Sequence, residues 1–285
     1  MVLGRPEVTV VVPTYERPEY LRRALETVRI QTEAPARVVV SDNASSTSTR
    51  EVVNEFRKYA ICDVEYIRHE TNIGALANLQ SAIAASETDY VKILWDDDWL
   101  EPNCLEVLLD TMKATGADFV VTGSYGHVMG VDYLWYQQAA FVTSSFGDVL
   151  PGLAAGLYPV SPLAGLQIKD DLEAVLQADL FHPNALRPEL FVGPDAAMTY
   201  GGLLHGRRMA FTPSPVVHMF SDGDNMTGAF RDELQPFYVH TMKAMARAAG
   251  TRVDRRTARF FRDRLETRSA GLSSRIRRRW LSRQR

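Results

Sequence analysis

The chain has 285 residues, of which 46% are hydrophobic and 24% charged, a composition typical of a globular protein. No stretch approaches the ~18 consecutive apolar residues that a membrane-spanning helix needs, so we expect no such helix. Residues 1–7 have no long apolar core and run directly into a predicted strand, so we expect no signal peptide. The net charge of −3 combines −13 over residues 1–250 with +10 over residues 251–285, where 13 Arg face three acidic residues.

Five short apolar segments alternate with amphipathic segments over the first 123 residues. The apolar segments have the length and the flanking turn residues of buried strands, and the segments between them repeat apolar residues at helical spacing. This alternation predicts an α/β fold with one doubly wound, mostly parallel sheet and helices on both faces. The predicted strands are Val8–Val12, Arg37–Ser41, Asp63–Ile67, Tyr90–Leu94 and Ala117–Thr122, and the predicted helices are Glu19–Gln31, Glu51–Tyr59, Ala75–Ala85 and Asn103–Thr115.

Both cysteines lie in this region, Cys62 before the third predicted strand and Cys104 in the last of these helices. They are far apart in the sequence and lack the spacing of a metal site. We therefore expect free thiols in a reducing compartment, which indicates a cytoplasmic protein.

Polar residues follow the first three predicted strands. The first strand runs into Pro13-Thr14-Tyr15, where a dinucleotide-binding fold would carry Gly-x-Gly-x-x-Gly and a nucleotidyltransferase a glycine-rich loop with an arginine. The second ends at Asp42, which can accept hydrogen bonds from a base or a ribose, or can simply close a turn. Asn72 precedes the next helix and equally fits a helix entry.

Three adjacent carboxylates, Asp96, Asp97 and Asp98, follow the fourth predicted strand. Their mutual repulsion opposes ionising all of them, and a divalent cation would remove that repulsion. Oxygen ligands suit Mg²⁺ or Mn²⁺, and ligands of open α/β sheets bind at the carboxyl ends of the strands. The triplet therefore predicts a metal that holds a diphosphate, and a solvated acidic turn before a helix is the simpler alternative.

These motifs together resemble one family. Val-Val-Pro-Thr-Tyr at 11–15, Ser-Asp-Asn-Ala-Ser at 41–45, Asn-x-Gly at 72–74 and the acidic triplet with Trp99 and Pro102 are similar to the nucleotide-sugar domain of family 2 glycosyltransferases with the GT-A fold. The resemblance covers roughly residues 7–123 and continues more weakly through 185–220. There, residues 191–195 resemble the segment with the catalytic base, and residues 213–218 resemble a strand that ends in a metal-binding His.

The resemblance implies a donor-nucleotide site at the ends of the first strands. Pro13, Thr14 and Tyr15 would line the pocket for the nucleobase, and Asp42 would face the base. Asn72 would lie beside the nucleotide.

The resemblance also implies a metal and a base. Asp96 and Asp98 would correspond to the family's Asp-x-Asp element, which handles ribose and metal, and Asp97 would contact the nucleotide. The triplet can be aligned with the family motif in two ways, and in the second of these Asp97 would be the metal ligand in place of Asp98. Asp195 would be the general base, although it also fits a helix N-cap. His218 would be the third protein ligand to Mn²⁺ or Mg²⁺.

We therefore predict a metal-dependent, inverting glycosyltransferase that uses a nucleotide-diphosphate sugar, with a UDP-sugar favoured over a dTDP- or GDP-sugar. The alternatives are a nucleotide-sugar-binding protein without transferase activity and a nucleotidyltransferase. We expect a nucleotide-sugar-binding half at 1–123, an acceptor-binding and catalytic half at 124–225, and a helical, Arg-rich C-terminal extension at 226–285. The sequence carries no readable signal for the acceptor.

The basic C-terminal extension carries Phe260, Phe261 and Leu265 within about one helical turn, among many Arg residues. This composition is typical of a basic amphipathic helix at a membrane surface, here the anionic inner face of the membrane. The alternative is that the helix docks on the acidic body, within one chain or across a dimer. Nucleic acid is not expected as a partner, because the extension shows no recognition motif.

Overall fold

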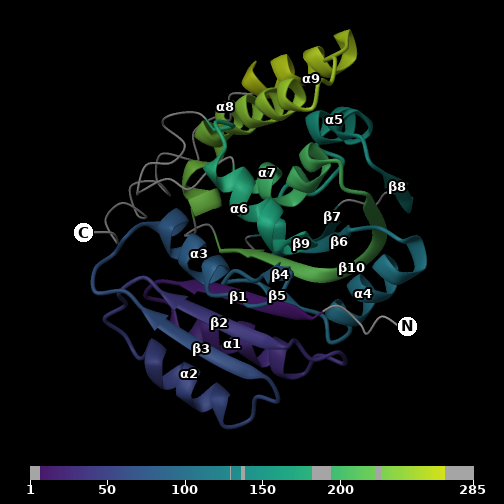
Figure 1. Cartoon of the computed structure of the whole chain (residues 1–285). Helices are drawn as coiled ribbons and strands as arrows, with labels where there is room; N and C mark the ends of the chain where they lie inside the picture. The colour runs from purple at the N-terminus through teal and green to yellow at the C-terminus, as the bar shows by residue number, and fades with distance from the viewer. Residues whose placement is uncertain (1–6, 129, 136–138, 182–193, 223–225, 267–285) are drawn as a thin grey trace.

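The computed structural model describes residues 7–128, 130–135, 139–181, 194–222 and 226–266. Its strands form one mixed sheet in the order β3-β2-β1-β4-β9-β6-β10-β5, with β7 paired to β6 and β8 paired to β10. Figure 1 shows helices on both faces of this sheet, and α8 and α9 at the end of the molecule opposite β3. The predicted α/β class with helices on both faces is confirmed, and the sheet is mixed. Strands β3, β2, β1 and β4 pair in parallel, as β6 does with β10, and the other five pairings of the described strands are antiparallel.

The first half of the sheet follows the predicted order of strands and helices. All its neighbouring strands are parallel, and the side chains of α1 that were predicted to share one face, Leu21, Ala24, Leu25 and Val28, are all buried. The elements are β1 (Val8–Thr14), α1 (Pro18–Arg29), β2 (Arg37–Asp42), α2 (Thr49–Arg57), β3 (Asp63–Arg68), α3 (Ala75–Ala84), β4 (Tyr90–Ile93) and α4 (Cys104–Thr115).

Two cores lie on the two faces of these strands. Successive side chains of a strand point to opposite faces, so Val10 and Val12 of β1 join the core that contains α1 and α2. Val11 joins the second core, with Leu79 of α3. Both faces of β1 and β2 are covered, which explains why these two strands carry consecutive Val residues.

The second half of the sheet contains order that the sequence did not reveal, since no period was visible across residues 124–190. Here β9 runs antiparallel between β4 and β6, and β6 pairs in parallel with the long β10. The elements are β5 (Trp99–Leu100), β6 (Phe119–Val128), β7 (Val131–Trp135), β8 (Phe141–Thr143), α5 (Phe146–Ala155), β9 (Gly165–Ile168), α6 (Lys169–Gln177), α7 (Pro194–Tyr200), β10 (Met209–Ser221), α8 (Met226–Ala248) and α9 (Arg255–Glu266).

One expectation about β10 was wrong. The strand does not end at His218, because Met219, Phe220 and Ser221 continue to pair with β6. His218 therefore lies inside the strand, where its side chain is half-buried and has fixed neighbours.

The two halves of the sheet are joined by a fully buried lysine, Lys92 of β4. Its Nζ donates hydrogen bonds to the backbone carbonyls of Leu163 and Gly165, in the segment that leads into β9. Burial lowers the pKa of Lys92, and the two carbonyls offset part of the cost of removing its amine from water. Both cysteines are free thiols, as predicted, and Cys104 is buried.

The C-terminal helix α9 docks on the rest of the chain, against α5 and α8. The Phe261 side chain is buried at this contact, and the ammonium of Lys243 lies 5.6 Å from the centre of its ring. The side chain of Leu265 lies outside the described residues. One core contains residues of all three predicted segments, so the division at 123 and 225 stays a prediction about function.

We expect Phe261→Ala to lower the free energy of unfolding by about 3 kcal/mol, the usual cost of deleting a buried aromatic ring. Chemical denaturation of the full chain measures this cost. Arg262→Ala, at an exposed position of the same helix, is the control and should change stability by less than ~0.5 kcal/mol. Equal stability of the two variants would contradict the docking of α9 through Phe261.

Candidate functional site

The acidic triplet lies where β4 ends, and two of its three side chains are buried. Asp96 is 6% exposed and Asp98 is 5% exposed. The hydroxyl of Thr14, at the end of β1, donates to Asp96 Oδ2 at 2.8 Å. The backbone N–H of Phe220, on β10, donates to Asp98 Oδ1 at 2.8 Å. The turn therefore bridges the two halves of the sheet.

Two arginines of the α1 region hold this turn, and the sequence analysis assigned a role to neither. Arg17 Nη1 lies 3.0 Å from Asp97 Oδ2 and 3.4 Å from Asp96 Oδ1. Arg23 donates to the backbone carbonyl of Asp97, and its guanidinium carbon lies 4.3 Å from the ring centre of Trp99. An arginine just after a strand-end motif was a signal that could have indicated Arg17.

The pKa values of the buried carboxyls reflect first their burial and then the charges around them. Burial raises the pKa of Asp96 to about 6, and the positive charge of Arg17 opposes that rise. Burial, together with the charge of Asp97, raises the pKa of Asp98 well above its usual value. Carboxyls perturbed in this way are typical of functional sites, where a cation or a phosphate ligand changes their charge balance.

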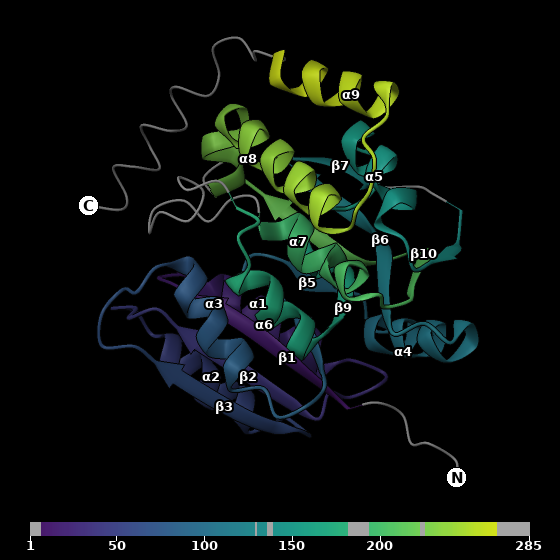
Figure 2. The ribbon, with the colours of Figure 1, turned by 45° about the horizontal axis from the view of Figure 1, so that its top comes forward.

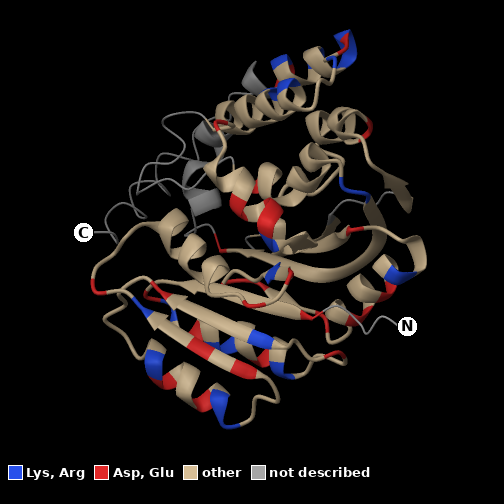
Figure 3. Ribbon diagram, viewed as in Figure 1, with Lys and Arg blue, Asp and Glu red and all other residues tan. Residues whose placement is uncertain are grey.

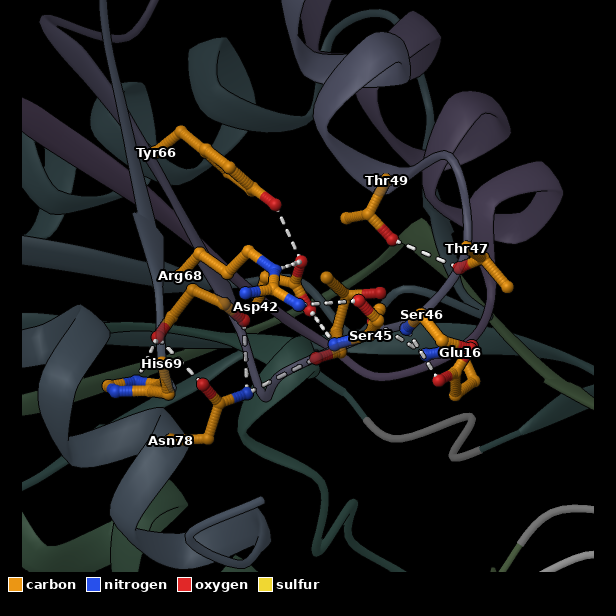
Figure 4. Close-up of polar contacts among 12 residues, drawn as sticks. Glu16, Asp42, Ser45, Ser46, Thr47, Thr49, Tyr66, Arg68, His69 and Asn78 are labelled. Atoms are coloured by element: carbon orange, nitrogen blue, oxygen red, sulfur yellow. Dashed lines mark hydrogen bonds and ion pairs between the residues drawn. The ribbon is translucent and has the colours of Figure 1, made fainter. Parts of the chain in front are cut away.

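Asp42 is buried at the end of β2, within a cluster of polar side chains (Figure 4). The hydroxyl of Tyr66 donates to Asp42 Oδ2 at 2.6 Å, and the backbone N–H of Ser45 donates to Oδ1 at 2.9 Å. Arg68 Nε lies 4.0 Å from Oδ2. Asn78 of α3 donates to the carbonyl of Ser41 at 3.0 Å and so fixes the end of the strand.

The loops after β1 and β2 are locked to each other. The Glu16 N–H donates to Ser45 Oγ at 2.8 Å, and the Glu16 carboxylate accepts from the Ser46 N–H at 2.7 Å. Glu16 and Ala44 both have positive φ, 56° and 68°, which is unusual for residues other than glycine. Such strained backbone persists where its surroundings hold it, often at functional sites. The sequence analysis did not identify this lock.

The remaining predicted donor-site residues lie near these loops. Pro13 and Thr14 pair with Ser41 and Asp42 in the parallel ladder, so the predicted base pocket and Asp42 share one edge of the sheet. Asn72 is exposed and bonds to the Asn43 side chain and to the N–H of Gly74. Tyr15 is half-buried. The nucleotide-binding roles of these residues stay predictions.

His218 lies in a hydrogen-bonded chain of side chains. Its Nε2 lies 2.7 Å from Glu101 Oε1, and its Nδ1 lies 2.8 Å from His127 Nε2. His127 Nδ1 in turn lies 2.6 Å from Asp132 Oδ1. Trp99 stacks on both imidazoles, with ring centres 4.7 Å and 5.0 Å away. No local pattern could reveal these partners, because Glu101 and His127 are 117 and 91 residues from His218.

The donor atoms at the turn suit a hard cation, but they are not gathered into a complete site. Among the residues that the structure describes, no group of three or more His, Cys, Asp or Glu side chains is arranged to hold a metal ion. Asp96 and Asp98 supply the oxygen ligands that Mg²⁺ and Mn²⁺ prefer. Burial lowers the pKa of His218 and favours the neutral ring that metals bind, yet both ring nitrogens have partners.

The metal roles of Asp96, Asp98 and His218 stay predictions, as does the choice between Asp97 and Asp98. If His218 is a ligand, it must release Glu101 or His127.

Asp195 is the second residue of α7, so it lies within the helix as the structure defines it. The Tyr238 hydroxyl, from α8, donates to Asp195 Oδ2 at 3.0 Å. The Thr199 hydroxyl donates to the Asp195 carbonyl at 2.7 Å. Residues 191–193 of the predicted catalytic segment lie outside the described residues. The role of Asp195 as a base stays a prediction.

Comparisons with known proteins agree on the kind of protein. The family model for "Glycosyl transferase family 2" matches residues 9–160. Abequosyltransferase RfbV of Salmonella typhimurium is 30% identical over 122 residues, which cover 38% of this chain and 37% of that protein. Glycosyltransferase GlyA of Streptococcus pneumoniae is 28% identical over 137 residues, 45% of this chain and 19% of that protein. The chain thus spans about a third or less of the length of these two relatives.

Two further matches extend over more of the chain. The succinoglycan biosynthesis protein ExoM of Rhizobium meliloti is 26% identical over 214 residues, which cover 73% of this chain and 64% of that protein. The crystal structure of residues 1–349 of S. aureus TarS in complex with UDP-GlcNAc matches with a TM-score of 0.64 and 17% identity. That match covers 97% of this chain and 72% of the TarS chain, and at this identity it supports a shared fold.

We expect Asp98→Asn to raise the melting temperature of the ligand-free protein by a few degrees near pH 8. The folded state raises the pKa of Asp98, so stability falls as pH rises from the unfolded pKa through the folded pKa. Asparagine removes this loss and can still accept from the Phe220 N–H.

Thermal unfolding between pH 4.5 and 8 measures this effect, and the advantage of Asp98→Asn should grow as pH rises. Asp89→Asn, at an exposed position before β4, is the control and should follow the unmodified protein. A constant difference across the pH range would show that the charge of Asp98 carries no penalty.

Proposed function

The chain belongs to glycosyl transferase family 2, and on that premise we propose that it is an inverting glycosyltransferase that uses a nucleotide-diphosphate sugar. The observation that carries this proposal is the buried acidic turn, with Asp96 and Asp98 at the carboxyl edge of the sheet. Asp42 lies at the carboxyl end of β2, two strands away in the same sheet. A nucleotide at Asp42 with its diphosphate toward the turn would follow the rule that ligands of such sheets lie across the strand ends.

A UDP-sugar is the proposed donor, with dTDP- and GDP-sugars as the other candidates. TarS, which shares the fold, was crystallised with UDP and with UDP-GlcNAc. Asp42 is held by Tyr66 and Ser45, which suits a fixed acceptor for the N–H of a base. The acceptor would be a hydroxyl or an amine.

In the proposed reaction, the Asp195 carboxylate takes the proton of the acceptor as its oxygen or nitrogen attacks the anomeric carbon. The bond from that carbon to the diphosphate breaks, so the configuration inverts and a nucleoside diphosphate leaves. A Mn²⁺ or Mg²⁺ ion held by Asp96 and Asp98, with His218 as a third ligand, would neutralise charge on the diphosphate. Arg17, whose side chain is one-third exposed beside Asp97, would add a fixed positive charge.

Two other functions keep the same fold. A nucleotide-sugar-binding protein would bind the donor without turnover, and a nucleotidyltransferase would release pyrophosphate. The proposed glycosyltransferase releases a free nucleoside diphosphate. The loop Pro13-Thr14-Tyr15 speaks against the nucleotidyltransferase, because it lacks the glycine-rich phosphate loop.

We expect the full chain to release UDP from a UDP-sugar in the presence of Mn²⁺, and Asp96→Ala and Asp98→Ala each to reduce this rate by about 100-fold or more. The physical reason is the loss of charge stabilisation at the leaving diphosphate. Chromatography of the products measures the release. Asp89→Ala is the control and should retain the full rate.

Other outcomes of this experiment lead to different conclusions. Undiminished rates in both turn variants would refute the metal site at Asp96 and Asp98. Inactivity of Asp97→Ala alone would select the second alignment, with Asp97 as the ligand. Donor binding without release would favour the binding protein, and pyrophosphate would favour the nucleotidyltransferase.

For its location, we propose a cytoplasmic protein that contacts the anionic inner face of the membrane through α9. No helix among the described residues is long and apolar enough to cross a membrane. With Phe261 turned into the fold, the contact would rest on charge. Figure 3 shows basic residues along α9, and the exposed ones in and just before it are Arg252, Arg255, Arg256, Arg259 and Arg262. The alternative is self-association of this basic face with the acidic body of a second copy.

We expect the full chain to float with phosphatidylglycerol vesicles at low salt and to be released at about 0.5 M salt, because attraction near the surface is about 1 kcal/mol per basic residue and is screened. Replacing Arg255, Arg256, Arg259 and Arg262 together by Gln should weaken flotation. Replacing Arg22 and Arg29, exposed on α1, is the matched control. Absence of flotation at low salt would contradict the membrane contact and favour self-association through the basic face of α9.

A further inference from the structure

Helix α8 contacts the proposed catalytic carboxylate directly. The hydroxyl of Tyr238 donates to Asp195 Oδ2 at 3.0 Å, across the contact between α8 and α7. Figure 2 shows α8 running beside α7. Both side chains are half-buried, so this hydrogen bond is partly shielded from competing water.

The backbone of Asp195 is fixed on the other side. Thr199, one turn later in α7, donates to the Asp195 carbonyl at 2.7 Å and also lies 2.8 Å from the carbonyl of Val160. Next in sequence, Tyr200 donates to the carbonyl of Pro159 at 2.7 Å. The segment before β9 therefore anchors the backbone of α7, and orienting the Asp195 side chain takes a separate restraint.

Tyr238 can supply that restraint because its own position is set by the core. Val239 is 3% exposed, and Met242 and Met245 are fully buried, so this part of α8 is held in the hydrophobic core. A phenol has few rotatable bonds and presents its hydroxyl at a fixed distance from the backbone. The bond to Oδ2 opposes rotation of the carboxylate.

We propose that Tyr238 is a positioning residue for Asp195, so that α8 completes the catalytic site from outside the segment that the family model matches. This inference rests on the proposed function, in which Asp195 takes the proton of the acceptor. A general base works only within hydrogen-bond reach and in the right orientation, and groups that orient a catalytic side chain also tune its basicity. A donor to the ionised carboxylate favours its charged form.

The test is Tyr238→Phe in the full chain, with transfer measured across pH. We expect kcat to fall about tenfold at neutral pH, the scale of a hydrogen bond to a charged group. KM for the donor should stay unchanged, because Tyr238 bonds to Asp195, the proposed general base, whereas the proposed donor site lies at the carboxyl ends of β1 and β2. The acid limb of the pH profile should move to higher pH, since the carboxylate then loses a donor that favours its ionised form.

Tyr66→Phe is the matched control, because it removes the same hydroxyl from another carboxylate, Asp42, at 2.6 Å. It should raise KM for the donor and leave the acid limb in place. Thermal unfolding of both variants shows whether they are folded. The double variant Asp195→Asn with Tyr238→Phe should be no slower than Asp195→Asn alone if the two residues act as a unit.

The outcomes separate this inference from the proposed function. Wild-type turnover in Asp195→Asn would refute Asp195 as the base and the inference with it. An inactive Asp195→Asn together with an unchanged kcat and acid limb in Tyr238→Phe would overturn only the role of Tyr238. A further loss in the double variant would assign Tyr238 a structural role and would also overturn the proposal.

Discussion

The crowding of negative charge at Asp96, Asp97 and Asp98 is the constraint on which the rest of the site depends. Two of these carboxylates are almost completely buried, and burial opposes their ionisation. Their partners come from separate elements: the Thr14 hydroxyl on β1, the guanidinium of Arg17 at the start of α1, and a backbone N–H on β10. The groups that stabilise the buried carboxylates therefore connect both halves of the sheet at the carboxyl end of β4.

A second buried charge is handled differently. Lys92 lies on the strand that leads to the acidic turn, and its amine is satisfied by backbone carbonyls in place of carboxylates. Neutral carbonyls offset part of the cost of burying the amine, and the charge of Asp98 also favours its charged, protonated form. In the same way, the charge of Arg17 favours the ionised form of Asp96, and that of Arg23 favours the ionised form of Asp98.

The proposed site draws on all three parts of the chain. Residues 9–160, which the family model matches, contain Asp42 with its polar partners and the acidic turn with its arginines. Asp195 and His218 lie beyond that segment, and both are held by side chains distant in sequence, Tyr238 and Glu101. Short loops after parallel strands thus fix the positions of the residues proposed to bind the donor. The position of Asp195, the proposed base, depends instead on how α7 and α8 pack.

Much of the fold could be predicted from local pattern. Strands such as Val8–Val12 can be recognised in the sequence, because a short run of apolar residues without helical spacing is typical of a strand that is buried on both faces. The acidic triplet could be identified from the sequence for an equally local reason. Three adjacent carboxylates repel one another in any fold, so their negative charge needs a positive or hydrogen-bonding partner. Strands β8 and β9 were not readable, because they are short and pair with strands far away in the sequence, so that neighbours in space and not in sequence stabilise them.

The sequence by itself therefore determined the class of fold, the parallel first half of the sheet and the presence of an acidic site at its edge. Only the tertiary structure decided what surrounds that site. Arg17 at the acids, Glu101 and His127 on His218, and Tyr238 on Asp195 are long-range contacts. Periodicity reports which face of an element is buried, and it carries no information on which distant side chain meets that face.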